Sequence, residues 1–140
     1  MKKLISLLLV LALGVSVLLV PAWAQGNEEA SPYYVNTSSA RTTIVIDDDG
    51  TASIQVYCLG LSNVKSIKAT TYLEQKVNGS WTRVDIDQPN DQWVNTTALR
   101  VFSTTITHQL TSTGTYRAVT TFVVTASSSE TITLYSEATY

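Results

Sequence analysis

The chain has 140 residues, of which 44% are hydrophobic and 14% are charged, and its formal net charge is −2. This length suits a single domain, which can bury about 60% or more of its unfolded surface without metal or disulfide staples. The mild acidity and the lack of any Lys/Arg cluster argue against nucleic acid or an anionic membrane surface as a partner.

The first 24 residues have the pattern of a secretory signal peptide. Lys2 and Lys3 precede the apolar run Leu4–Val20, and the small residues Ala22 and Ala24 mark a cleavage site after Ala24. The sequence therefore predicts a secreted protein, extracellular or on the cell surface, with no membrane association after the leader is removed. The apolar run has about the minimum length of a membrane-spanning helix. The alternative to a cleaved signal peptide is therefore an uncleaved membrane anchor.

Residues 25–41 are polar and lack periodicity, which predicts a flexible lead-in before a domain over 42–140. In that domain Thr, Val, Ile and Tyr are abundant, and apolar residues recur at every second position, as in half-buried strands. No segment has the spacing of a helix. We therefore predict an all-β antiparallel sandwich of about seven strands, at Thr42–Ile46, Thr51–Leu59, Val64–Val77, Ser80–Ile86, Leu99–Leu110, Thr115–Thr125 and Thr131–Ser136.

The segment Thr51–Leu59 shows the clearest alternation in the chain. Every second residue is small or apolar, and the residues between them are Ser53, Gln55 and Tyr57. The first set should face the core; it comprises Ala52, Ile54, Val56 and Cys58.

Two turns and one loop separate the earlier strands. The run Asp47–Gly50 ends in a glycine, which favours a polar hairpin turn with positive φ at its last residue. Asn78-Gly79 favours a tight turn, because both of its central positions need positive φ. Residues 87–97 are polar, and we expect a loop that holds Trp93.

The segment Thr111–Ala118 resembles the corner before the sixth strand of immunoglobulin-like domains. Gly114 and Tyr116 stand where that family has a Gly and a Tyr, which implies that the Tyr116 hydroxyl binds upstream backbone. In antibody-type domains a cysteine two residues later pairs with one on the second strand. Here Ala118 takes the first place and Cys58 looks like the second, so the resemblance implies an immunoglobulin-like sandwich with Cys58 as a buried thiol.

The layout of the chain also resembles a group of small exported proteins of unknown function from Gram-positive, clostridia-like bacteria. The segments that carry this resemblance are Gln75–Trp81 and Thr113–Arg117, together with the leader. It implies the fold and the compartment, and it implies no activity, since fold alone does not carry one.

The sequence does not favour an enzyme, a metal site or a cofactor. A Cys–His pair needs an exposed thiolate of low pKa, whereas Cys58 belongs to the core face. A serine triad would have only His108 as its base, and one His with one Cys cannot ligate zinc. The carboxylates of Asp47–Asp49 are consecutive and diverge, so a polar turn explains them better than calcium does.

The function that we expect is a non-catalytic interaction module of unknown ligand, which presents loops and a sheet face to a protein partner. One alternative is a carbohydrate-binding module, since sugars stack on exposed aromatic rings. Another is an assembling structural subunit of the cell surface, which would pair through an open sheet edge. The candidate ligand-binding residues are Trp81, Trp93 and Tyr72; the alternative is that Trp81 covers the hairpin and Trp93 closes one end of the sandwich core. The sequence leaves the ligand and the oligomeric state open.

Overall fold

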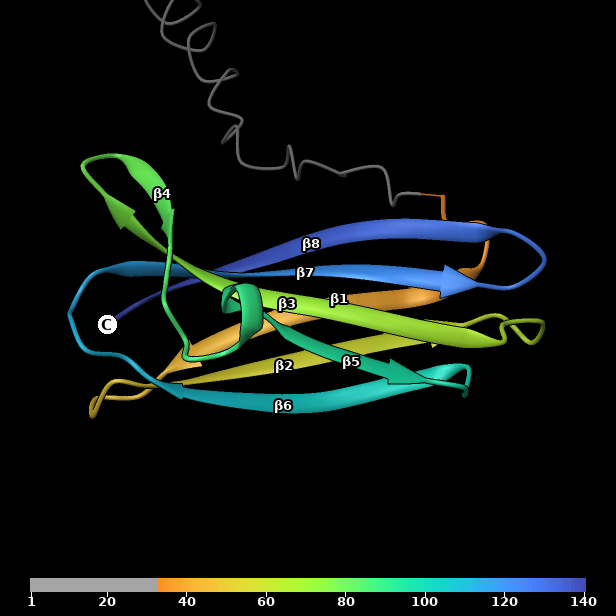
Figure 1. Ribbon diagram of the computed structural model, residues 1–140, viewed down its shortest axis with the longest axis horizontal. Coiled ribbons are helices and arrows are strands. Elements are labelled where there is room, and N and C mark those ends of the chain that lie inside the picture. The colour runs from red at the N-terminus through yellow and green to blue at the C-terminus, as the bar shows by residue number, and fades with distance from the viewer. Residues whose placement is uncertain (1–32) are drawn as a thin grey trace, which may run out of the picture. The chain divides into compact units, whose positions relative to one another are not determined.

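The computed structural model describes residues 33–140, so the signal peptide predicted for 1–24 and most of the lead-in lie outside the described residues. The described part is built almost entirely from strands (Figure 1). The elements are β1 Thr37–Ile46, β2 Thr51–Gly60, β3 Ser66–Val77, β4 Ser80–Arg83, the 3-10 turn η1 Pro89–Asp91, β5 Trp93–Thr97, β6 Val101–Gln109, β7 Thr115–Thr125 and β8 Ser129–Thr139.

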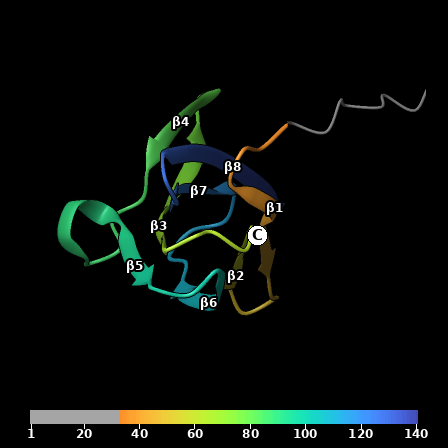
Figure 2. The same cartoon turned by 90° about the vertical axis from the view of Figure 1, so that its right-hand side faces the viewer.

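The strands form two antiparallel sheets that pack face to face (Figure 2). The three-stranded sheet has the order β1-β2-β6. The five-stranded sheet has the order β4-β3-β7-β8, and β5 also pairs with β3. The chain changes sheets after β2, after β5 and after β6, as it does in immunoglobulin-like sandwiches. The prediction of an all-β antiparallel sandwich is confirmed, with eight strands in the described residues where about seven were expected.

The hydrophobic core lies between the inward faces of the two sheets. The alternation predicted for β2 is confirmed, because its small and apolar set is fully buried. Burying the larger members of this set, Ile54 and Val56, stabilises the fold by about 1.5–3 kcal/mol each relative to leaving them in water. The residues at the centre of this core include Ile54, Val56, Cys58, Leu73, Tyr116, Ala118 and Phe122.

The tyrosine corner predicted between β6 and β7 is present. The Tyr116 hydroxyl donates a hydrogen bond to the Ser112 carbonyl oxygen at 2.7 Å. Gly114, between them, has a φ of 148°, which a residue with a Cβ rarely adopts. This corner joins β6 in one sheet to β7 in the other, so it fixes how the chain passes between the layers.

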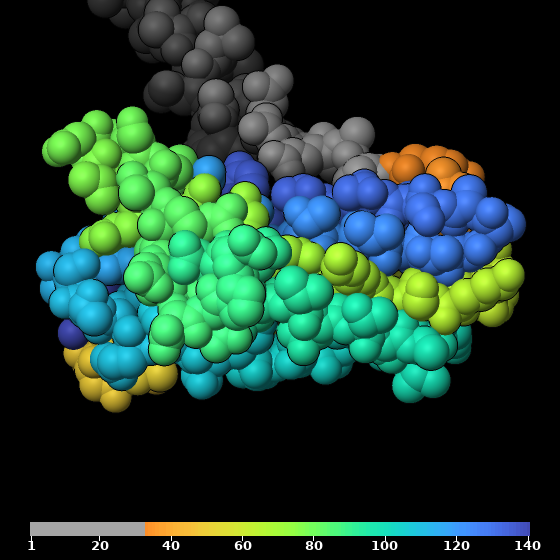
Figure 3. Space-filling model, in the orientation of Figure 1, coloured from red at the N-terminus to blue at the C-terminus, as the bar shows by residue number. Residues whose placement is uncertain are grey.

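The predicted hairpins have the expected turn geometry. Asn78 and Gly79 both have positive φ, at 51° and 83°, as the tight turn between β3 and β4 requires. Gly50 also has a φ of 83°, which confirms the turn between β1 and β2. In the space-filling view the β3–β4 hairpin projects beyond the body of the sandwich, and the segment between β4 and β5 lies across its front (Figure 3).

The strand β1 begins at Thr37, ahead of the predicted Thr42. The cause is a set of polar contacts to Glu130 in β8. Its carboxylate accepts hydrogen bonds from the backbone N–H groups of Val35 and Asn36, at 2.6 and 3.0 Å, and from the Thr37 hydroxyl at 2.9 Å. These contacts hold the chain in place before its apolar alternation starts.

The second half of the loop that was predicted for residues 87–97 forms the strand β5, while the first half holds the turn η1. Trp93 to Thr97 pair with β3, in a register that sets Trp93 opposite Thr71 and Thr97 opposite Ile67. Its residues are mostly exposed, so the segment carries no alternating apolar signal. Pairing with β3, rather than burial of a face, defines this strand.

Side chains close the two open sides of the sandwich. On one side β1 lies beside β8, and the Ile44 backbone N–H donates to the Ser136 hydroxyl at 3.3 Å (Figure 2). On the other side Trp93 of β5 meets His108 of β6, with their ring centroids 5.9 Å apart at an interplanar angle of 65°. The two sheets are therefore tied together along both sides.

Candidate functional site

The outer face of the five-stranded sheet gathers aromatic and cationic side chains from four strands. In β3 the residues that alternate with the buried ones point outward, and they include Tyr72, Glu74 and Lys76. The strand register sets Tyr72 opposite Val119 of β7, and Val119 opposite Tyr135 of β8. We call this surface the aromatic–cation face and define it by Tyr72, Glu74, Lys76, Trp81, Arg83, Arg117 and Tyr135.

Val119 shows how closely these side chains pack. Alternation along β7 places it on the outer side of the sheet, between Tyr72 and Tyr135, yet it is only 6% exposed. Tyr135 itself is 64% exposed. The side chains of this face therefore cover the sheet beneath them, whereas the Tyr135 ring extends into solvent.

Cationic groups lie over the aromatic rings of this face. The Arg83 guanidinium carbon lies 3.4 Å from the centroid of the Tyr72 ring. The Arg117 guanidinium carbon lies 4.4 Å from the Trp81 ring and 5.7 Å from the Tyr135 ring. Such contacts contribute about 0.5–1 kcal/mol each when exposed and more when desolvated. They also hold the arginine side chains in defined positions.

Lys76 adds a third cation to the face, because its ammonium nitrogen lies 5.6 Å from the Trp81 ring centroid. Trp81 is opposite Lys76 in the register between β3 and β4. Trp81 therefore has two cations near its ring, one from β3 and one from β7.

Carboxylates balance part of this charge, since Glu137 of β8 lies opposite Arg117 in the register and Glu74 of β3 bonds to it. Glu74 Oε2 accepts a hydrogen bond from Arg117 Nε at 2.5 Å, and the two side chains are 14% and 25% exposed. Glu74 is also opposite Arg83 in the β3–β4 pair. It therefore lies between two arginines and makes an ion pair with one of them.

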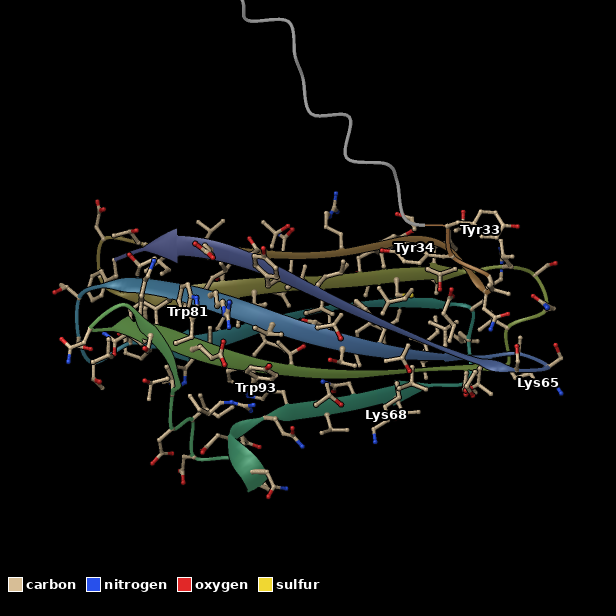
Figure 4. The ribbon with its side chains drawn as sticks, turned by 90° about the horizontal axis from the view of Figure 1, so that it is seen from above. Tyr33, Tyr34, Lys65, Lys68, Trp81 and Trp93 are labelled. Atoms are coloured by element: carbon tan, nitrogen blue, oxygen red, sulfur yellow. The ribbon has the colours of Figure 1, made fainter. Side chains whose placement is uncertain are left out.

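Two of the three residues predicted as ligand-binding, Trp81 and Tyr72, belong to this face. Trp93 does not, because it packs against the core and against His108. Figure 4 views the face from outside, with Trp81 near β4 and Trp93 toward β5. Trp93 therefore serves as edge cover, which was the other role expected for the tryptophans.

The sequence reasoning missed Arg83, Arg117 and Tyr135. Alternation along β8 puts Tyr135 on the outward set, so the pattern held a signal for this residue. The two arginines could not be placed from the pattern, because their contacts depend on how β3 pairs with β4 and with β7.

The structure places Cys58 and His108 in different surroundings. Cys58 is fully buried, and this burial raises the pKa of its thiol to about 11. His108 lies opposite Ala52 in the β2–β6 pair, whereas Cys58 lies opposite Phe102. A buried thiol of raised pKa is unsuited to act as a nucleophile.

Two kinds of feature are absent from residues 33–140. No group of three or more His, Cys, Asp or Glu side chains in this range is placed to hold a metal ion. No helix in the same range is long and apolar enough to cross a membrane.

Comparisons with known proteins give no further guidance on the site. No protein-family model, no curated protein and no solved structure matches this chain. Its function is therefore argued from the aromatic–cation face itself.

Proposed function

We propose that this protein is an exported, non-catalytic interaction module that binds a protein partner through the aromatic–cation face. The observation that carries the proposal is the gathering of three aromatic rings and two arginines on one side of a rigid sheet, with Arg83 over the Tyr72 ring and Arg117 near the rings of Trp81 and Tyr135. Tyr, Trp and Arg are the residues that dominate binding energy at protein interfaces. Export rests on the leader predicted for 1–24, and the resemblance to small exported bacterial proteins agrees with it.

The contacts within the face support binding at low entropic cost. A free arginine side chain loses about 0.5–1.5 kcal/mol of rotamer freedom when a partner immobilises it. Arg83 is already stacked on Tyr72, and Arg117 is already paired with Glu74 and stacked on Trp81. Less ordering is therefore needed when the partner arrives.

A glycan ligand is the alternative use of the same face. Sugars need an open ring face for stacking. Arg83 lies over the Tyr72 ring, and Trp81 has both Arg117 and Lys76 near its ring. Since cations lie over these two rings, the arrangement favours a protein partner over a sugar.

Self-assembly through a sheet edge is the other alternative. It would require edge strands whose backbone groups are open to a second chain. Along one side, the β1 and β8 edges face each other and share the bond between Ile44 and Ser136. This side is therefore a poor place for strand addition.

Site-specific cross-linking tests the proposal. A photoreactive p-benzoylphenylalanine is placed at Tyr135 on the aromatic–cation face, and in a second variant at Tyr57 on the outer face of the other sheet. Tyr57 is the matched control, because it too has an arginine near its ring, Arg41 at 6.0 Å. The proposal predicts a protein adduct from position 135, formed in cells that make the protein and competed by the unmodified chain.

The outcome at the two positions decides the matter. Equal adducts from 57 and 135, or none from 135, would refute the proposal. An adduct to polysaccharide rather than protein would move the glycan alternative to the front.

A further inference from the structure

The aromatic–cation face carries more cations than carboxylates. Lys76, Arg83 and Arg117 are gathered there with two acids: Glu74, which forms its ion pair with Arg117, and Glu137 of β8, which lies opposite Arg117 in the strand register. The chain as a whole has a net charge of −2. The face is therefore a positive region on an otherwise acidic protein, which is the arrangement that draws an oppositely charged partner.

Arg83 is the arginine of the face that makes no ion pair within the described residues. A guanidinium has five N–H donors. Within the described residues, the one acceptor recorded for Arg83 is the Asp91 carbonyl oxygen, a long contact of 3.4 Å from Nη1. The Tyr72 ring holds the guanidinium plane in place, and the residue itself is exposed. The N–H groups at the edge of the Arg83 guanidinium therefore face solvent in a fixed orientation.

The ion pair between Glu74 and Arg117 shows that a guanidinium of this face binds a carboxylate. The Glu74 carboxylate is held by Arg117 at 2.5 Å, beside the ring of Trp81. Arginine binds planar carboxylates with two parallel hydrogen bonds where the geometry permits, and these charge-assisted bonds are the strong ones. A second carboxylate beside Arg83 would complete the same arrangement.

We propose that the partner presents an acidic protein segment, whose Asp or Glu carboxylate binds Arg83 and competes with Glu74 for Arg117. This inference rests on the proposed function and specifies the chemistry of the partner. A protein segment is favoured over an acidic polysaccharide because cations lie over the Tyr72 and Trp81 rings, where a sugar would have to stack.

Poly-L-glutamate is the probe for the first test. Its binding to the purified protein is followed by tryptophan fluorescence, since Trp81 lies beside Arg117. Arg83→Glu should weaken binding about tenfold or more, because it replaces a charge-assisted bond with a repulsion. Arg83→Lys should weaken it less, since the charge stays while the planar fork is lost. Arg41→Glu makes the same charge change on the other sheet and should leave the affinity within about twofold.

A second variant predicts a change of the opposite sign. Glu74→Gln removes the internal carboxylate that competes for Arg117, so poly-L-glutamate should bind about threefold or more tightly than to the unaltered protein. Asp47→Asn serves as the control. It removes one negative charge in the turn between β1 and β2, which belong to the other sheet. Binding should also weaken as NaCl is raised, because the Debye length falls.

Each outcome supports the inference or overturns it. An equal loss in the Arg83→Glu and Arg41→Glu variants would overturn it, because binding would then follow net charge alone. Tighter binding of polygalacturonate than of poly-L-glutamate would overturn it in favour of an acidic glycan. A partner cross-linked at position 135 whose binding ignores Arg83→Glu would overturn this inference and leave the proposed function standing. The absence of that cross-link would instead remove the proposed function.

Discussion

The two outer faces of the sandwich are built from similar strands and differ sharply in chemistry. On the three-stranded sheet, Thr43, Gln55 and Thr105 lie side by side in register, and the one stacked cation is Arg41 near Tyr57 at 6.0 Å. On the five-stranded sheet, each of three cations lies over or near an aromatic ring, and one of them, Arg117, also pairs with Glu74. The inner faces of both sheets form one hydrophobic core. The two sheets therefore differ in chemistry only on their outer faces.

The β3–β4 hairpin accounts for much of this difference. It supplies Trp81 and Arg83, which pair across to Lys76 and Glu74. The three-stranded sheet has no corresponding hairpin among the described residues, and its strands pair only with each other. A short extra strand, set by the Asn78-Gly79 turn, is therefore enough to add an aromatic and a cationic side chain to one sheet of the sandwich.

The largest effect is expected at the corner that joins the two sheets. Tyr116→Phe removes the hydrogen bond from the buried Tyr116 side chain to the Ser112 carbonyl oxygen and should lower the free energy of unfolding by about 1–2 kcal/mol. Tyr57→Phe, a hydroxyl loss on an outward-facing ring, should change it by less than about 0.5 kcal/mol. Urea denaturation measures both, and an unchanged midpoint for Tyr116→Phe would reject the corner.

The next effect is a difference in stability between matched arginine variants on the two outer faces. Arg117→Ala loses the ion pair with Glu74 and the contact with Trp81, so it should cost about 1–2 kcal/mol of unfolding free energy. Arg41→Ala should cost less than about 0.5 kcal/mol, because its ring contact is longer and its side chain is exposed. Equal costs in urea denaturation would mean that the two faces are energetically alike.

A smaller effect is expected where Trp93 and His108 close one side of the sandwich. Burial lowers the pKa of His108 below its ordinary value of 6.5, and the charge of Asp85 acts in the opposite direction. The folded state therefore prefers the neutral imidazole, so stability should fall as the pH drops through 6.5 and level off below the folded pKa.

NMR titration of this single histidine tests the prediction. The midpoint in the folded protein should lie below 6.5, and His108→Gln should remove the corresponding loss of stability between neutral and mildly acidic pH. A midpoint at or above 6.5 would show that His108 gains charge stabilisation from the fold, contrary to its burial.

The smallest effect concerns tryptophan quenching. Arg117 and Lys76 surround Trp81 with positive charge, so iodide should quench its fluorescence more than caesium does. Trp93, which packs on the core and His108, should show no such preference. Comparing the Trp81→Phe and Trp93→Phe variants separates the two signals. A caesium preference at Trp81 would contradict the charge assigned to this face.

Local patterns were enough to predict the sandwich. The alternation in Thr51–Leu59, the Asn78-Gly79 turn and the Tyr116 corner each depend on nearby residues, and each is present in the structure. The strand β5 was not predictable in this way, because its residues are mostly exposed and only its pairing with β3 defines it. The early start of β1 depends on Glu130, which lies more than ninety positions away along the chain.

The candidate site was predictable only in part for the same reason. Outward alternation identified Tyr72, and the hairpin identified Trp81. The contacts of the arginines depend on strand register, because Arg117 meets Glu74 and Trp81 only when β7 and β4 both pair with β3. Trp93 was assigned to the site because a polar loop was expected, and its pairing in β5 turns it toward the core instead.

The most direct test of the central claim maps the binding face by ¹H–¹⁵N NMR. The partner identified by cross-linking is added to the isotope-labelled protein, and amide shifts are followed on both sheets. The shifts should gather around Tyr72, Arg83, Arg117 and Tyr135, while the amides of Arg41, Thr43 and Tyr57 stay in place. Shifts gathered on β1, β2 and β6 would contradict the assignment of binding to the aromatic–cation face.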